Sequence, residues 1–252
     1  MFRLDASKEF LLWLAATEGD LETAVRLTAD PEVDVNWQDT EGQRTPFYRA
    51  CGHGRVEVVA HLLRVPGLDI NLRRDNGATP FAIVCDQGHT RVAELLLQDP
   101  RLDINRRNRE EITPLWFAAH CGCLDVVQQI LASGRFVDVT AKSMSGPHRW
   151  NNKTPAEVGR LQATRLRYDD ESDFEYSRAK EFGPRAAELL DEYLADPGGV
   201  QARLRRLPHI RGKWGVLSFP HAGRRLKRFG SFVQTVMWQD FLPCVSMWQT
   251  GT

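Results

Sequence analysis

Several features are missing from this chain of 252 residues, and each absence excludes a class of protein. Five cysteines are too few, and odd in number, for the disulfide framework of a small secreted protein. No stretch of about 18 apolar residues runs without polar interruption, so we expect no membrane-spanning helix. No glycine-rich phosphate loop and no Gly-x-Ser-x-Gly motif is present. We therefore expect no enzymatic activity, no cofactor and no metal site. We expect the protein in a reducing compartment, the cytoplasm, with the nucleus as the alternative.

Net charge is also zero over the whole chain, but the two signs are unevenly placed. Residues 1–200 hold 24 basic and 32 acidic side chains, a net charge of −8. Residues 201–252 hold nine basic side chains and one acidic one, a net charge of +8. The C-terminal part could therefore meet an external anion or the acidic part of its own chain.

What the sequence does contain is a repeat with a period of 34 residues. Thr45-Pro46, Thr79-Pro80 and Thr113-Pro114 recur at this interval, and a glycine follows each proline by eight residues. Asp-Val-Asn or Asp-Ile-Asn triplets recur in phase and end in Asn36, Asn71 and Asn105. Such a period is typical of a solenoid built from stacked units. We expect the three asparagines to cap the turns that follow them.

Each unit is predicted to contain two short helices. The threonine hydroxyl can accept an N–H from the first helical turn, and proline at the first helical position loses no needed donor. In the middle unit, Gly88 ends the first helix, because the chain must turn there with positive φ. Apolar residues between Val92 and Leu97 have the spacing of a second helix. A degraded copy, with Phe10-Leu11 in place of Thr-Pro, is predicted to cap the array.

The pattern T-P-[FL]-x-x-[AV]-[AC]-x-x-G-x-x-x-V-[VA]-x-x-[LI]-L, followed by D-[VI]-N, resembles the ankyrin repeat over residues 10–139. The resemblance implies an all-α solenoid of four to five units, each with a β-turn finger and two antiparallel helices. Two departures stand out. Tyr48, Ala82 and Trp116 replace the histidine usual after Thr-Pro-Leu, and Glu111 occupies the place of a finger glycine.

The predicted repeat domain spans residues 1–200. A fifth unit starts at Thr154-Pro155, 41 residues after the previous Thr-Pro, with its second helix from Pro184 to Ala195 and an acidic insertion at 169–175 between them. Residues 201–252 show no repeat, and we expect a poorly ordered segment, basic and then apolar. The predicted units lie near 10–38, 39–72, 73–106, 107–140 and 150–196.

The resemblance further implies that a partner protein binds the concave face, which the finger tips and first helices line. This face mixes aromatic side chains with arginine, a composition enriched in interface hot spots. We expect a partner with an acidic rim and an apolar centre. In the alternative, the Tyr48 and Trp116 side chains only fill the groove between repeats. The predicted binding residues are Tyr48, Arg49, Arg73, Arg74, Asn76, Ile83, Arg106, Arg107, Arg109, Trp116 and Phe117.

Two other functions were weighed. Residues 201–230 contain nine Lys or Arg and no acid, so they could bind a nucleic acid or an anionic membrane surface. Binding of that kind should weaken steeply with salt, whereas a mixed apolar interface should not. Cys121-x-Cys123 beside His120 could bind a soft metal, but no second matching pair exists, and we interpret these residues as structural.

Overall fold

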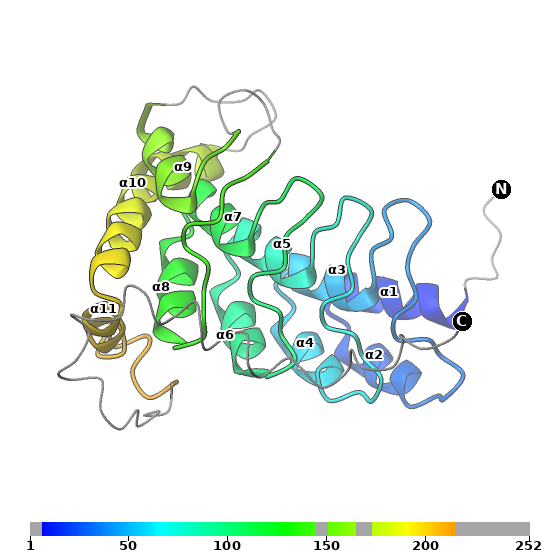
Figure 1. The fold of residues 1–252 in the computed structure, drawn as a ribbon. Coiled ribbons are helices and arrows are strands. Elements are labelled where there is room, and N and C mark those ends of the chain that lie inside the picture. Colours follow the sequence, from blue (N-terminus) through cyan, green and yellow to red (C-terminus); the bar gives the residue numbers. More distant parts are fainter. Residues whose placement is uncertain (1–6, 145–150, 165–172, 215–252) are drawn as a thin grey trace, which may run out of the picture. The chain divides into compact units, whose positions relative to one another are not determined.

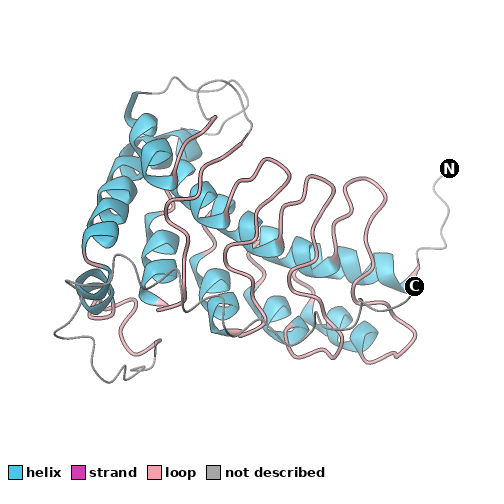
Figure 2. Ribbon diagram, in the orientation of Figure 1, coloured by secondary structure: helices cyan, strands magenta, loops and turns pink. Residues whose placement is uncertain are grey.

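The computed structural model describes residues 7–144, 151–164 and 173–214, and this part of the chain is helical without a strand (Figure 1, Figure 2). The described residues form one compact unit that extends to Trp214. No helix in the described ranges is both long and apolar enough to cross a membrane. The helices are α1 (Lys8–Glu18), α2 (Leu21–Thr28), α3 (Pro46–Gly52), α4 (Val56–Leu62), α5 (Pro80–Gln87), α6 (Thr90–Gln98), α7 (Pro114–His120), α8 (Leu124–Ala132), α9 (Pro155–Leu161), the 3-10 turn η1 (Gln162–Thr164), α10 (Asp173–Ala195) and α11 (Pro197–Leu204).

The helices stack in two rows. α1, α3, α5, α7 and α9 contact one another in that order, and α2, α4, α6 and α8 form the second row beside them. Phe47, Phe81 and Leu115, one from each Thr-Pro unit, are almost wholly buried between the rows. Long loops run side by side along the stack and connect each pair of helices to the next (Figure 2). The all-α solenoid predicted from the repeat is confirmed.

The Thr-Pro pairs start the first helices in the way that the sequence predicts. The hydroxyl oxygens of Thr45, Thr79 and Thr113 accept the N–H three residues later, at 2.9, 3.2 and 3.3 Å. At the fifth unit, Thr154 and Glu157 form a reciprocal capping box. In the degraded first copy, Ser7 supplies the cap instead, and α1 therefore begins at Lys8, earlier than the predicted Phe10.

Each finger turns through one residue with positive φ, just before the Thr-Pro pair. Gly77 has a φ of 83°, and the equivalent residues Gln43 and Glu111 have φ of 53° and 59°. The third finger therefore keeps this turn although Glu111 replaces the glycine. A side chain with a Cβ pays about 1–2 kcal/mol for this conformation.

Gln43→Gly should raise the free energy of unfolding by about 0.5–1 kcal/mol, because relief of the left-handed strain exceeds the added entropy of the unfolded chain. Gln43 is exposed, and only its backbone is hydrogen-bonded among the described residues. Chemical denaturation would measure the change. Gln98→Gly, at the exposed end of α6, is the control and should lower stability instead. A loss of stability in both variants would contradict this account of the finger.

The sequence predicted that the repeating asparagines cap their own finger turns. This prediction is wrong, because the asparagine side chains join successive units. Asn71 donates its amide to Arg101 O at 2.8 Å and accepts the backbone N–H of Asp103 at 2.9 Å. Asn36 and Asn105 make the same pair of bonds to the next loop along the chain. In each triplet the aspartate side chain accepts the asparagine N–H and makes the local turn. The triplet therefore divides the work: its aspartate closes a turn and its asparagine bridges two repeats.

The fifth unit differs from the sequence prediction in its second helix. That helix, α10, begins at Asp173 rather than Pro184, so Pro184 lies inside it. The predicted acidic insertion, 169–175, lies partly outside the described residues and partly in α10. Contacts override the local signal of proline, because Ala179 is buried and the Arg178 guanidinium binds Cys121 O at 2.9 Å. α10 crosses α9 closely: a Cβ on Gly159 would lie 2.6 Å from Gly183 O.

The boundary predicted after residue 200 falls inside α11, and the chain stays packed on the stack up to Trp214. Val200, Leu204 and Ile210 are buried, and Arg205 Nε donates to Ala132 O at 2.9 Å. The basic residues that suggested a poorly ordered segment thus include some that hold the segment to α8. The rest of that segment, 215–252, lies outside the described residues.

Candidate functional site

The first helices carry one partly exposed side chain each at the same repeat position. Arg49 on α3, Ile83 on α5 and Phe117 on α7 follow one another at intervals of 34 residues. Each follows the proline of its Thr-Pro pair by three residues and is partly buried. The row therefore offers a cation and two apolar side chains along the face that the sequence predicted.

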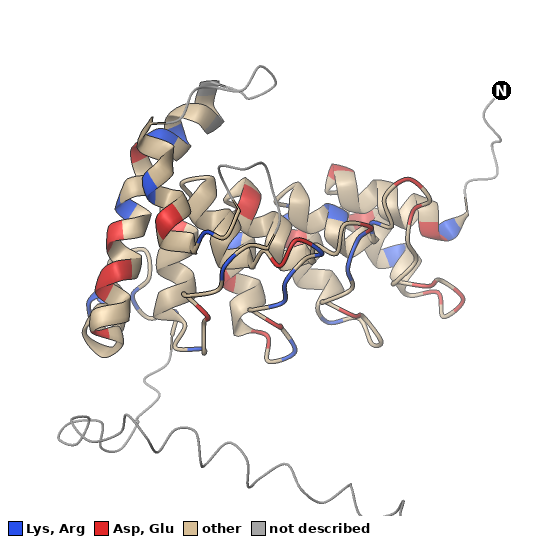
Figure 3. Cartoon of the chain, turned by 45° about the horizontal axis from the view of Figure 1, so that its top comes forward, with Lys and Arg blue, Asp and Glu red and all other residues tan. Residues whose placement is uncertain are grey.

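Basic residues recur along successive fingers (Figure 3). Arg73 and Arg109 are exposed, and their side chains have no ion-pair partner among the described residues. Arg106 lies 3.8 Å from Asp103, an exposed pair that contributes little. Arg107 is held by Glu111 at 3.2 Å and by Asp138 at 3.1 Å. The charge most available to a partner is thus at Arg73, Arg106 and Arg109.

Asn76 lies at an exposed finger tip between these arginines, but its side chain already has a task. Its Oδ1 accepts the backbone N–H of Ala78 at 2.9 Å and closes the finger. Only the amide nitrogen of Asn76 is left for a partner.

Two of the predicted aromatic residues lie inside the stack. Tyr48 and Trp116 are 5% and 4% exposed. Trp116 donates its indole N–H to Lys153 O at 3.1 Å and stacks on the His120 ring at 5.0 Å between centroids. These side chains fill the groove between repeats, as in the alternative stated above, and leave little surface for a partner.

A hollow of about 260 Å³ opens between the first two Thr-Pro units, and we call it the arginine hollow. Three guanidinium groups line it, from Arg44, Arg49 and Arg74. Arg49 lies over the Trp13 ring, 4.5 Å from its centroid, and its Nε donates to Thr17 Oγ1 at 3.1 Å. Arg74 is 3.5 Å from the Tyr48 hydroxyl. The remaining lining residues are Tyr48, Gly52, His53, Ile83 and Gln87.

The electrostatics of this hollow reflect its burial and its cations. Burial, and then the charge of Arg44, lower the pKa of Arg49. Burial, followed by the charges of Arg49 and Arg55, also lowers the pKa of His53. Burial raises the pKa of the Tyr48 hydroxyl, which therefore stays protonated. Arg44 and His53 were not among the residues predicted from the sequence. For Arg44 a visible signal existed, because the next two units have Ala78 and Ile112 at this position before Thr-Pro.

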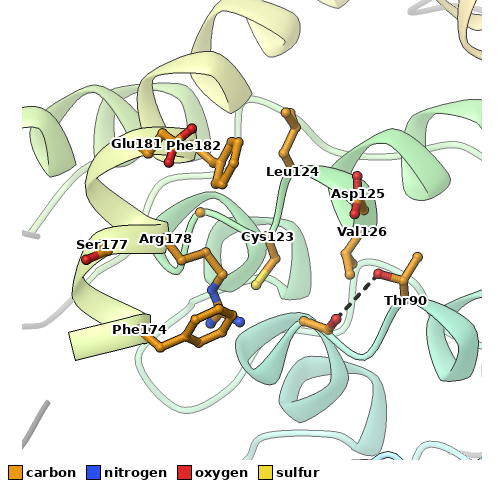
Figure 4. A pocket seen from close by; sticks show the side chains of 12 residues that line it. Thr90, Cys123, Leu124, Asp125, Val126, Phe174, Ser177, Arg178, Glu181 and Phe182 are labelled. Atoms are coloured by element: carbon orange, nitrogen blue, oxygen red, sulfur yellow. Dashed lines mark hydrogen bonds between the residues drawn. The ribbon is translucent and has the colours of Figure 1, made fainter. Parts of the chain in front are cut away.

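A second hollow, of about 410 Å³, lies where α10 meets the turn between α7 and α8 (Figure 4). Phe174 and Arg178 extend from α10 toward this hollow, opposite Cys123 and Val126. The Phe174 side chain is 73% exposed. The Arg178 guanidinium donates to Cys121 O, Gln87 O and Asp86 O, so it serves the carbonyl ends of α5 and α7. The guanidinium of Arg178 is thus occupied by the fold.

The cysteines described by the structure have no reactive character. Burial raises the pKa of the Cys123 thiol to about 12 and raises the pKa of Cys85 and Cys121 well above the ordinary value. The Cys121 thiol donates to Asp86 Oδ1 at 3.2 Å. The Cys123 thiol donates to Asp86 O at 3.7 Å, so both thiols of the C-x-C segment are hydrogen-bonded within the fold, which favours the structural interpretation of this turn.

The basic segment weighed as a nucleic-acid or membrane contact is described only as far as Trp214. Within that part, Arg203 pairs with Glu192, Lys213 pairs with Glu94, and Arg205 binds a backbone carbonyl of α8. Arg206 and Arg211 remain exposed. The cluster Arg224–Arg228 lies outside the described residues.

Comparison with known families assigns the fold. The family model described as ankyrin repeats, in three copies, matches residues 12–108 and 57–143, slightly more than half of the chain. The matched residues run from within α1 through α8 and include the fingers between these helices. Ankyrin repeats are generally protein–protein interaction modules. On its fold and on this match, the chain belongs to the ankyrin repeat family.

Proposed function

We propose that this chain binds a partner protein through its finger tips and first helices, and that the partner presents acidic groups around an apolar centre. The observation that carries the proposal is the arrangement of exposed arginines on neighbouring fingers beside partly exposed apolar side chains. Arg73 and Arg109 lie on the fingers, and Ile83 and Phe117 lie on α5 and α7. Arginine and aromatic side chains that can be desolvated together are typical of interface hot spots.

The second-row helices support this choice of face by contrast. The exposed basic residues there, such as Arg26 on α2 and Arg91 on α6, stand singly rather than in a row. A nucleic-acid interaction is favoured less, because three of the five basic residues between 201 and 214 already serve intramolecular contacts. The proposal therefore rests on the fingers rather than on the C-terminal segment.

Affinity capture with charge-reversed variants tests the proposal. Arg73→Glu with Arg109→Glu should reduce recovery of the partner at least tenfold, since it places like charges against an acidic rim. Arg26→Glu with Arg91→Glu makes the same change in charge on the second row and should leave recovery unchanged. Both pairs are exposed, so we expect changes in the free energy of unfolding within about 0.5 kcal/mol.

The outcome can go against the proposal in two ways. Equal recovery by the finger variant and the wild type would exclude this face. A second contrary result has two parts: both double variants lose recovery to the same extent, and recovery falls as a steep power of the salt concentration. That result would indicate a general attraction between charges and not a specific interface.

A further inference from the structure

Two of the cations in the arginine hollow occupy places that the next two units give to apolar side chains. In the next two fingers, the position of Arg44 is held by Ala78 and Ile112, which are 7% and 6% exposed. The position of Arg49 is apolar on α5 and α7. A guanidinium in a half-buried place costs desolvation free energy. Arg49 offsets part of this cost over the Trp13 ring and at Thr17, whereas Arg44 Nε has no hydrogen bond within the described ranges to offset it.

Arg74 is a third departure from the repeat. In the neighbouring fingers the equivalent residues are Asp39 and Asn108, and each accepts two backbone N–H groups of its own finger. An arginine cannot accept a hydrogen bond. Asn76 takes over part of this task by accepting from Ala78 N. The second finger has thus exchanged a turn-closing acceptor for a cation, and that cation lines the same hollow as the other two.

The guanidinium groups have unused donors. Arg44 Nε is buried and has no hydrogen-bond partner among the described residues. Arg49 uses only Nε, toward Thr17, and its two terminal nitrogens have no protein acceptor in the described part of the chain. The buried Nε of Arg44 is out of reach of a ligand, so the donors that the hollow offers are the terminal nitrogens of these guanidinium groups.

Of the acids near the hollow, Asp75 pairs with Arg74, and the others are engaged outside the hollow. No aspartate or glutamate lines it. Asp39 accepts Gly42 N and Arg44 N within its finger, and Asp75 accepts Arg74 Nε at 3.2 Å and Asn76 N at 2.7 Å. Asp86 accepts the Cys121 thiol and the Gln87 amide. Three cations therefore face a hollow of about 260 Å³, room for one small charged group rather than a drug-sized ligand.

We infer that the arginine hollow binds an oxyanion, a phosphate or a carboxylate, carried on a side chain of the partner polypeptide. Guanidinium groups bind both anions through charge-assisted, often paired hydrogen bonds. The protonated Tyr48 hydroxyl adds a neutral donor at the wall. This inference deepens the proposed function, because it names the group that anchors the partner on the same face.

The first experiment needs no partner. Inorganic phosphate is titrated into the full chain at constant ionic strength, and the arginine Nε–H signals are followed by ¹H–¹⁵N NMR. The wild type should show saturable shifts, and Arg44→Gln should weaken phosphate binding about tenfold or more, the value of one hydrogen bond to a charged group. This variant removes no hydrogen bond made by the Arg44 side chain, so it should fold normally; Arg74→Gln provides a second test.

Arg26→Gln with Arg91→Gln is the matched control, because it removes two exposed charges from the second row of helices, outside the hollow. Phosphate binding should change less than twofold in this control. A response that is linear and equal to that of chloride would overturn the inference. So would an equal loss of phosphate binding in Arg44→Gln and the control.

The second experiment identifies the source of the oxyanion. Three peptide pools with the same randomised flanks carry phosphoserine, glutamate or serine at the centre. Selective retention of the phosphoserine pool assigns a phosphorylated partner, and retention of both acidic pools assigns any acidic side chain. Equal retention of all three pools, or retention unaffected by Arg44→Gln, contradicts the inference. The phosphate titration does not depend on the captured partner. If Arg73→Glu with Arg109→Glu left recovery of the partner unchanged, the proposed face would be rejected, and the phosphate titration would still test the arginine hollow separately.

Discussion

Gly122→Ala should lower the free energy of unfolding by about 3 kcal/mol or more and release α10 from the stack. Gly122 has a φ of 64°, and a Cβ there would lie 2.5 Å from Arg178 O and 2.7 Å from Ala179 Cα. Both atoms belong to the backbone of α10, so no side-chain rotation relieves the overlap. Displacing α10 would also break the bonds from Arg178 to the ends of α5 and α7. Denaturant unfolding and amide exchange in α10 measure the two effects.

Gly67→Ala separates the steric term from the conformational one. Gly67 also has a left-handed backbone, with a φ of 79°, but a Cβ there would meet nothing within 4 Å. This control should lose only about 1 kcal/mol. Equal losses in the two variants would show that α10 does not lie on the turn at Gly122.

Ile210→Ala should have the second largest effect, a loss of about 2–5 kcal/mol, because it leaves a cavity under the C-terminal end of the stack. Ile210 is fully buried. Its segment is held from both sides, by Arg205 on Ala132 O and by Lys213 on Glu94. The result bears directly on the boundary, since an unpacked segment after residue 200 would not respond to this change.

The neighbouring Arg211 is exposed, so Arg211→Ala should change stability by no more than about 0.5 kcal/mol. Amide exchange should quicken in α8 and α11 for Ile210→Ala alone. Because end units of a repeat array can open separately, exchange is the more specific of the two measurements. Unchanged exchange in α8 together with unchanged stability would place Ile210 in solvent.

The parts of the fold that were predictable are those in which a residue acts on its own neighbourhood. Thr79 and Pro80 start a helix through bonds made within three residues, and Gly88 ends it through its own φ. Such signals repeat, and the repetition identified the family. The start of α10 was not predictable in this way, because Pro184 ordinarily marks the start of a helix, while the contacts of Arg178 and Ala179 that extend α10 come from distant residues.

The same distinction applies to the candidate site, where some features follow from the repeat itself and others depend on packing between repeats. The finger arginines could be found by counting along the repeat, because a finger tip is exposed wherever a finger forms. The burial of Tyr48 and Trp116 depends on how closely the next repeat packs, which the period does not specify. The arginine hollow joins Arg44 to Arg74 across two fingers, so its geometry exists only in the stack.

The asparagine bridges have a consequence for how the stack comes apart. Each one ties a loop to the following unit with a donor and an acceptor together. Separation of two interior units would leave backbone hydrogen-bonding groups without partners on both sides of the break. The outermost unit, in contrast, has a neighbour on one side only. Peeling from a terminus should therefore precede rupture of the interior, and the most durable section should be the one centred on Asn71.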